Sequence, residues 1–109
     1  MAKRTRKPTE RETALENQLS DLQLQRMAAV WMLRNGQPFT PETWVCVKGP
    51  RFSRLLARTD DAGFPSDVWH EATLTADVRF KILYGLTSAG KDAEWLQCAQ
   101  ALDAVMVAA

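Results

Sequence analysis

The chain has 109 residues, enough for one small domain and too few for two ordinary ones, and 46% of them are hydrophobic. Its formal net charge is only +1, and no run approaches the roughly 18 apolar residues that a membrane-spanning helix needs. We therefore expect a basic arm over residues 1–8 and a single domain over residues 9–109, without insertion into a membrane.

The charges are distributed unevenly along the chain. Two segments hold four basic residues and no acid: residues 1–8, with Lys3, Arg4, Arg6 and Lys7, and residues 48–58, with Lys48, Arg51, Arg54 and Arg58. The other six basic residues are outnumbered by all 13 acidic residues. A basic surface on an otherwise acidic body is typical of proteins that bind a polyanion.

The two cysteines indicate a compartment rather than a site. Cys46 and Cys98 have no metal-ligand spacing, and the basic amino terminus lacks the apolar core of a signal peptide. Both features predict a protein of the reducing cytoplasm. We expect no metal and no cofactor.

The first predicted elements are a flexible basic arm, Met1 to Pro8, and a helix that begins at Glu10. The arm has a simpler interpretation as a solubilising tail. Thr9 and Glu12 form a capping box for the helix, and Ser20 and Gln23 repeat the pattern. Either one long helix continues, or a second begins near Asp21. Asn35-Gly36 predicts the carboxyl-terminal end of this helical segment.

The middle of the chain predicts a short helix followed by a basic one. Thr40-Pro41-Glu42 predicts a helix from Pro41 to about Val47, and Gly49-Pro50 then breaks the chain. From Arg51 to Phe64 the spacing predicts a helix that Gly63 stops. The residues expected to face inward are Phe52, Leu55, Leu56 and Ala62, and those expected to face solvent are Arg51, Ser53, Arg54 and Arg58.

The last third predicts a two-stranded hairpin and a helix. Apolar residues alternate from Val78 to Leu86, as in a strand, and Trp69–Leu74 is the expected partner strand, although Val68–Thr75 also fits a helical turn. Thr87 is the expected cap of a helix from Ser88 to about Val107. Its apolar stripe consists of Trp95, Cys98, Ala99, Leu102, Val105 and Met106. We expect Trp31, Trp44, Trp69 and Trp95 to be core anchors.

Three stretches, in order, carry a family resemblance. They are Gln25–Gly36 with Phe39-Thr40-Pro41-Glu42, Phe52–Arg58 with Ala62-Gly63-Phe64, and Leu86-Thr87-Ser88-Ala89-Gly90. Over roughly residues 20–95 the chain resembles winged helix-turn-helix regulators, particularly MarR-type and related small repressors. The resemblance implies a mainly α fold with a small β-hairpin, in which the Arg51 helix recognises DNA.

The candidate DNA contacts follow from what a duplex presents, phosphates on both sides of a groove that admits one helix. Arg51 and Arg54 are candidates for guanine edges, and Lys48, Ser53 and Arg58 complete the predicted surface. Arg79 and Lys81 are candidates on the wing, and the arm residues Lys3, Arg4, Arg6 and Lys7 could reach a minor groove. The simpler interpretation is a solvated charged surface.

Catalysis is not expected, because the single histidine, His70, has no partner spacing and the side chains of Asp60 and Asp61 diverge on a helix. The sequence therefore predicts a cytoplasmic transcriptional regulator that binds double-stranded DNA. The resemblance further predicts a homodimer, formed by the first and last helices, on a palindromic site. The alternative is a small protein-interaction module or inhibitor on a compact helical or winged-helix fold.

Overall fold

The computed structural model describes the backbone of residues 10–106 and the side chains of residues 21–106. Within that part, the long helix α1 (Glu10–Arg34) precedes a three-stranded antiparallel sheet and two further helices, α2 (Ala76–Ser88) and α3 (Asp92–Met106). The strands β1 (Trp44–Lys48), β2 (Arg54–Thr59) and β3 (Pro65–His70) are neighbours in chain order. Helices with a small antiparallel sheet were expected, and this coarse prediction is confirmed.

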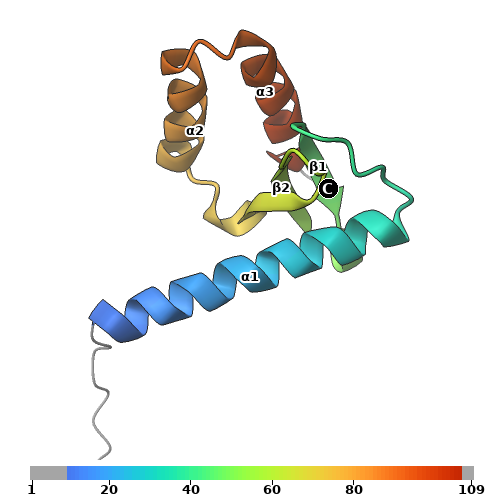
Figure 1. The fold of residues 1–109 in the computed structure, drawn as a ribbon, viewed down its shortest axis with the longest axis vertical. Coiled ribbons are helices and arrows are strands. Elements are labelled where there is room, and N and C mark those ends of the chain that lie inside the picture. Colours follow the sequence, from blue (N-terminus) through green and yellow to red (C-terminus); the bar gives the residue numbers. More distant parts are fainter. Residues whose placement is uncertain (1–9, 107–109) are drawn as a thin grey trace, which may run out of the picture.

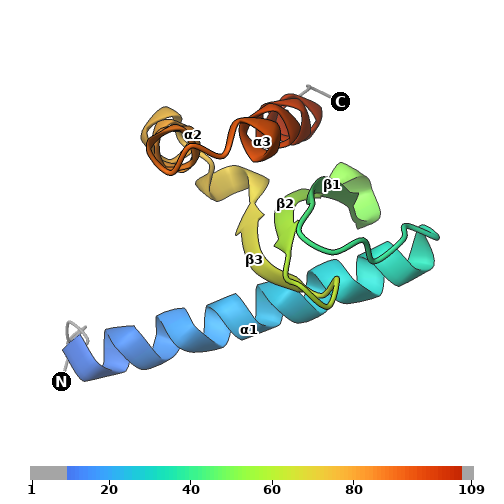
Figure 2. The ribbon, with the colours of Figure 1, turned by 45° about the horizontal axis from the view of Figure 1, so that its top comes forward.

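The sheet lies between two helical layers (Figures 1 and 2). Alternate strand residues point to opposite faces, and both faces are buried. Val47, Leu55 and Ala57 pack against Ala28 and Met32 of α1. On the other face, Trp44 and Leu56 join α2 and α3 in a second core with Leu74, Leu86, Cys98, Ala101, Leu102 and Val105.

Helix α1 is already formed at Glu10, the first described residue, and continues without a break through Asp21, so the interpretation as one long helix is the correct one. It ends where Asn35-Gly36 predicted, because Gly36 adopts a left-handed φ of 65°. The N–H of Gln37 donates to Met32 O at 2.9 Å and that of Gly36 to Leu33 O at 3.2 Å, which is the Schellman arrangement. The predicted arm and the Thr9–Glu12 capping box lie outside the residues whose side chains are described.

The two helices predicted in the middle of the chain are wrong. Residues 44–47 of the predicted Pro41–Val47 helix lie in β1, and residues 54–59 of the predicted Arg51–Phe64 recognition helix form β2, the central strand. Leu55 and Ala57 face α1 while Leu56 faces α3, so an uninterrupted apolar run fills both cores. The periodicity of such a short apolar run does not distinguish a buried strand from a buried helix.

The strand predicted from Val78 to Leu86 is also wrong, because this segment is α2. The Thr75 hydroxyl accepts from the N–H of Val78 at 3.3 Å and caps the helix. Val78, Ile82 and Leu86, four residues apart, pack into the core, whereas Phe80 and Tyr84 are exposed. The alternation arose from counting these two aromatics as core residues. The predicted partner, Trp69–Leu74, overlaps only the end of β3.

The last helix was expected from Ser88, but α2 runs through Ser88 and α3 starts at Asp92. Thr87 is not a cap, since its hydroxyl donates to Leu83 O within α2. The predicted stripe is buried at Cys98, Leu102 and Val105, but Trp95 and Met106 are exposed. No helix of the described residues is long and apolar enough to cross a bilayer.

Candidate nucleic-acid interface

The turn between β1 and β2 has an unusual backbone for its sequence. Arg51 adopts φ 55° and ψ 36°, Phe52 adopts φ 63°, and the N–H of Ser53 donates to Pro50 O at 3.1 Å. Two successive left-handed residues define a turn of type I′, which normally contains Asn-Gly. A left-handed conformation costs about 1–2 kcal/mol for a residue with a side chain, so this turn holds Arg and Phe against a local preference.

The turn is held against the end of α1. An added Cβ at Gly49 would lie 2.3 Å from the ring of Trp31, which shows how closely the chain passes over this ring. The Asn35 side chain donates to Lys48 O at 2.7 Å. These contacts bring Arg34, the last residue of α1, beside the hairpin.

Two adjoining open pockets of about 250 Å³ and 480 Å³ share Lys48 and Gly49. The first is lined by Trp31, Arg34, Asn35 and Pro50, and the second by Arg51, Phe52, Ser53 and Arg54. Phe52 is 77% exposed. We call the set Arg34, Lys48, Arg51, Phe52 and Arg54 the basic hairpin. It combines the cations and the exposed aromatic side chain that nucleic-acid surfaces use.

The structure therefore brings together four of the predicted site residues: Lys48, Arg51, Ser53 and Arg54. The sequence reasoning missed Arg34. A single arginine at a helix end carries no signal, and only the hydrogen bond from Asn35 to the hairpin reveals its position.

The charges of Lys48, Arg54 and Glu71 all reach the thiol of Cys46 on β1. Burial raises the pKa of the Cys46 thiol, Arg54 and Lys48 act in the opposite direction, and Glu71 raises it further. Arg54 and Glu71 thus have opposite effects on the pKa of the same thiol, that of Cys46. Arg51 and Phe52 lie at the exposed turn.

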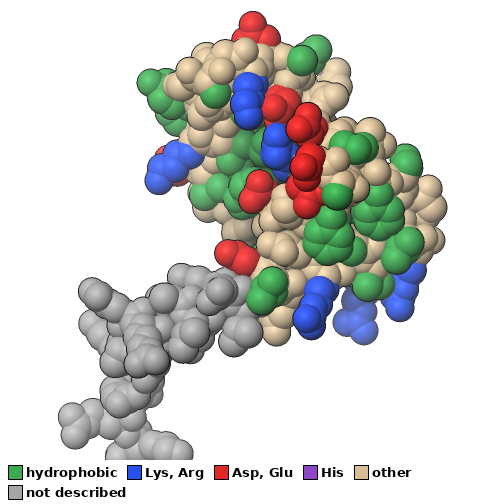
Figure 3. Space-filling view, viewed as in Figure 1, with side chains coloured by type: hydrophobic (Ala, Val, Ile, Leu, Met, Phe, Trp, Pro, Cys, Tyr) green, Lys and Arg blue, Asp and Glu red, His purple; other side chains and the backbone are tan. Residues whose placement is uncertain are grey.

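Arg58, predicted as a phosphate contact, is occupied within the protein. Its Nε donates to Glu94 Oε1 at 2.8 Å, and Trp44 Nε1 donates to the same oxygen at 3.1 Å. The bond to Glu94 raises the pKa of Arg58, and the charges of Asp67 and Glu42 add to it. Figure 3 shows acidic side chains around the middle of this face and Lys and Arg along its lower right edge. Arg58 therefore belongs to the acidic region and joins β2 to α3.

The Glu94 ion pair predicts an acid-sensitive component of stability. Hydrogen bonds from Arg58, and secondarily from Trp44, lower the pKa of Glu94 against the opposing effect of burial. Its contribution is present above the unfolded-state pKa of about 4.3 and is lost as pH falls through the lower folded value. In urea titrations, Glu94→Gln should be less stable than the parent at pH 7, and the difference should shrink towards pH 3. A difference independent of pH would contradict this assignment.

The remaining predicted DNA contacts do not join the basic hairpin. Arg79 and Lys81 lie on α2, which is at the opposite end of the molecule from the β1–β2 turn in Figure 2. The Nε of Arg79 is buried without a hydrogen-bond partner among the described residues, and Lys81 is exposed. The wing prediction is therefore wrong for both. Lys3, Arg4, Arg6 and Lys7 lie outside the described residues.

The histidine and the cysteines have structural environments. The Nδ1 of His70 accepts from the N–H of Ala72 at 3.0 Å, capping the 3₁₀ turn Glu71–Thr73. Burial raises the pKa of Cys98 to about 11, which keeps this thiol protonated at neutral pH. In the described part of the chain, no three His, Cys, Asp or Glu side chains are grouped to hold a metal ion.

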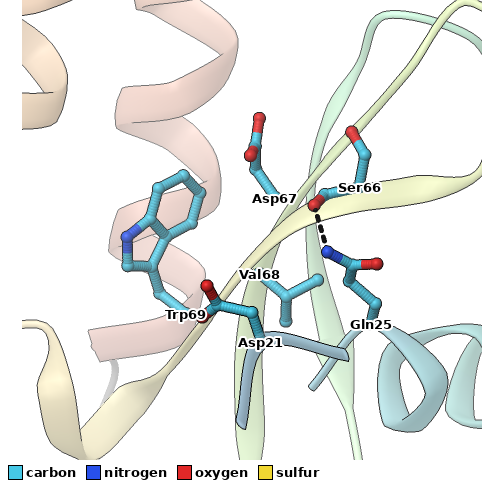
Figure 4. A pocket seen from close by; sticks show the side chains of 6 residues that line it. All are labelled: Asp21, Gln25, Ser66, Asp67, Val68 and Trp69. Atoms are coloured by element: carbon cyan, nitrogen blue, oxygen red, sulfur yellow. Dashed lines mark hydrogen bonds between the residues drawn. The ribbon is translucent and has the colours of Figure 1, made fainter. Parts of the chain in front are cut away.

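A further pocket, of about 210 Å³, lies between α1 and β3 (Figure 4). The Gln25 side chain donates to Ser66 O at 2.8 Å across it, and Asp21, Asp67, Val68 and Trp69 complete the lining. Its two carboxylates disfavour an anionic ligand. The basic hairpin is therefore the better site for a polyanion.

No protein-family model, curated protein or solved structure matches this chain.

Proposed function

We propose that this protein binds double-stranded DNA through the basic hairpin and regulates transcription by occupying its site. The observation that carries the proposal is that Lys48, Arg51 and Arg54 line one pocket with the exposed Phe52 of a strained turn. Lys48 also lines the adjoining pocket, which contains Arg34. Strained backbone persists where the surrounding structure enforces it, often at functional sites. A tight turn with Asn-Gly would join these strands more readily, so Arg51 and Phe52 have a role outside the fold.

The shape of the hairpin suits a groove. A major groove of about 12 Å admits a two-stranded ribbon as well as a helix. Arg51 at the tip supplies a guanidinium for a guanine edge or a phosphate, and Lys48 and Arg34 are placed for phosphates beside it. Phe52 offers an apolar contact to a thymine methyl group or a base step.

The charge distribution orients the protein on the duplex. Glu42, Asp67 and Glu94 surround Arg58 at the end of β2 opposite to the turn. These acids are repelled by phosphates, while the basic hairpin is attracted to them. This separation of charge favours an orientation in which the β1–β2 turn of the protein faces the DNA.

The proposal is tested by a salt titration of binding to a mixed-sequence duplex. Arg51→Ala and Lys48→Ala should each weaken binding about tenfold at low salt, and each should reduce the slope of log K against log salt by about 1. Lys81→Ala on α2 is the matched control, since it removes one exposed cation far from the turn. Equal weakening by all three substitutions, or no affinity for the parent protein, would overturn the proposal.

A protein partner is the second candidate. Phe80 and Tyr84 are both exposed on α2, with ring centroids 5.7 Å apart and planes 20° apart. Exposed aromatic side chains are typical hot spots of protein interfaces. If duplex binding fails while Phe80→Ala abolishes binding to an isolated partner, the interaction-module interpretation replaces the proposal.

A further inference from the structure

Helix α1 has two apolar faces rather than one. Leu24, Ala28, Trp31 and Met32 pack against the sheet. Leu22, Val30 and Leu33 are instead exposed at 45%, 44% and 68%. A surface helix with a single core usually carries polar residues on its outer side, so the outer apolar residues of α1 are not explained by the fold of one chain.

The outer residues belong to a regular heptad pattern. Six residues of α1 follow one another at spacings of four and three residues, which is the spacing of a coiled-coil seam. They are Leu15, Leu19, Leu22, Arg26, Ala29 and Leu33. At 100° per residue, the seam and the face that packs on the sheet lie on opposite sides of α1. Figures 1 and 2 show the amino-terminal half of α1 extending beyond the sheet, with no other element on its outer side.

We propose that two copies of this chain pair through the outer face of α1 as an antiparallel coiled coil. The charges of the helix decide the partner and the direction. Residues 10–21 contain four acids and one base, Glu10, Glu12, Glu16 and Asp21 with Arg11. Residues 22–34 contain Arg26 and Arg34 and no acid. An antiparallel pair of identical helices sets the acidic half of each against the basic half of the other, whereas a parallel pair sets like against like.

The seam is self-complementary in this direction. With the midpoint at residue 24, Leu22 faces Arg26 of the partner subunit, Leu19 faces Ala29 of the partner subunit, and Leu15 faces Leu33 of the partner subunit. Every apolar layer is thereby filled over a length of about 28 Å. Two central layers, related by the two-fold axis, pair Leu22 with Arg26, and these polar positions fix the register, as polar seam residues do.

This arrangement differs from the dimer expected from the sequence. The first and last helices were predicted to form one dimer surface, but α1 and α3 cover opposite faces of the sheet (Figure 2). One continuous surface cannot include both. The coiled coil uses α1 alone and does not depend on DNA binding.

A consequence for DNA rests on the proposed function. Arg34, the member of the basic hairpin that lies on α1, is ten positions from the midpoint of the seam. At 1.5 Å per residue, the two copies of Arg34 are about 30 Å apart along the coiled coil. The two sheets lie on opposite outer sides of the pair, so the two basic hairpins are further apart than this axial distance, and one dimer would present two separate contacts to DNA.

The dimer is tested by sedimentation equilibrium on the full chain without DNA. The parent protein should sediment as two chains, and the double variant Leu22→Glu/Leu33→Glu as one, with its helical circular dichroism retained because both side chains are exposed. Leu96→Glu, at an exposed position of α3, is the control and should remain a dimer. A monomeric parent protein at 0.1 mM, or a double variant that stays dimeric, would overturn the inference.

The direction is tested by disulfide crosslinking. Gln23→Cys lies beside its own copy only near the midpoint of the antiparallel pair, while Leu33→Cys meets its copy only in a parallel pair. We expect crosslinking of Gln23→Cys and none of Leu33→Cys. We also expect none of the parent, whose Cys98 is fully buried and whose half-buried Cys46 packs on the sheet face away from α1. The reverse pattern would refute the antiparallel arrangement. A dimer that forms without DNA affinity would leave this inference standing and reject the proposed function.

Discussion

Replacing Arg51-Phe52 by Asn-Gly is expected to raise the free energy of unfolding by about 1–2 kcal/mol and to weaken DNA binding at least about tenfold. The gain arises because both positions are left-handed, at φ 55° and 63°. Asn and Gly tolerate that conformation, and the entropy that Gly loses on folding offsets only part of the relief. The loss of affinity arises because the same change removes the tip cation and the exposed ring.

The single variants separate strain from charge. Phe52→Gly keeps all four cations of the basic hairpin, so its salt slope should match that of the parent while its affinity falls. Arg51→Asn should lower both the affinity and the slope. Urea unfolding measures stability, and fluorescence anisotropy with a labelled duplex measures binding. A double variant that loses stability would show that the turn is unstrained, and unchanged binding would remove the hairpin from the interface.

Gly63→Ala is expected to destabilise the protein by about 2–5 kcal/mol. Gly63 has a φ of 87°, and an added Cβ would lie 2.4 Å from Phe39 O and 3.0 Å from its carbonyl carbon. The left-handed conformation contributes about 1–2 kcal/mol and the overlap with rigid backbone about 1–3 kcal/mol. This is a large part of the 5–15 kcal/mol typical of a small domain.

Gly36→Ala is the matched control, because Gly36 has a similar φ of 65° but nothing within 4 Å of an added Cβ. It should cost only the conformational part, about 1 kcal/mol. The urea midpoints of the two variants measure the difference in their free energies of unfolding, provided that their m-values are equal. Equal losses for the two glycines would mean that the β2–β3 turn moves away from Phe39 at little cost.

Helix α1 shows what local pattern can predict. Its end at Asn35-Gly36 depends on capping, which acts within a few residues. Helices with a small antiparallel sheet were predicted, but the strands were expected at residues 69–74 and 78–86, whereas they lie at residues 44–48, 54–59 and 65–70. The assignment of residues 51–64 and 78–86 failed because their apolar residues fit both periods, and only packing partners separate the two.

The candidate site was predicted in part. Lys48, Arg51, Ser53 and Arg54 meet because they flank one turn, so sequence proximity found them despite the wrong secondary structure. Arg58, four residues beyond Arg54, belongs elsewhere because pairing of β2 with β1 carries it to the far end of the strand, beside Trp44 and Glu94. Arg34 joins the site only through the packing of α1 on the hairpin.

The sequence by itself determined the local features of this protein: where α1 ends, and that four basic residues without an acid fall within residues 48–58. The tertiary structure decided that β2 is a central strand, that Arg58 is occupied by Glu94, and that Arg34 stands beside Lys48. The physical reason is the distance along the sequence over which each interaction acts. Caps and turns depend on neighbours in the chain, whereas burial on both faces of a strand and ion pairing depend on residues tens of positions away.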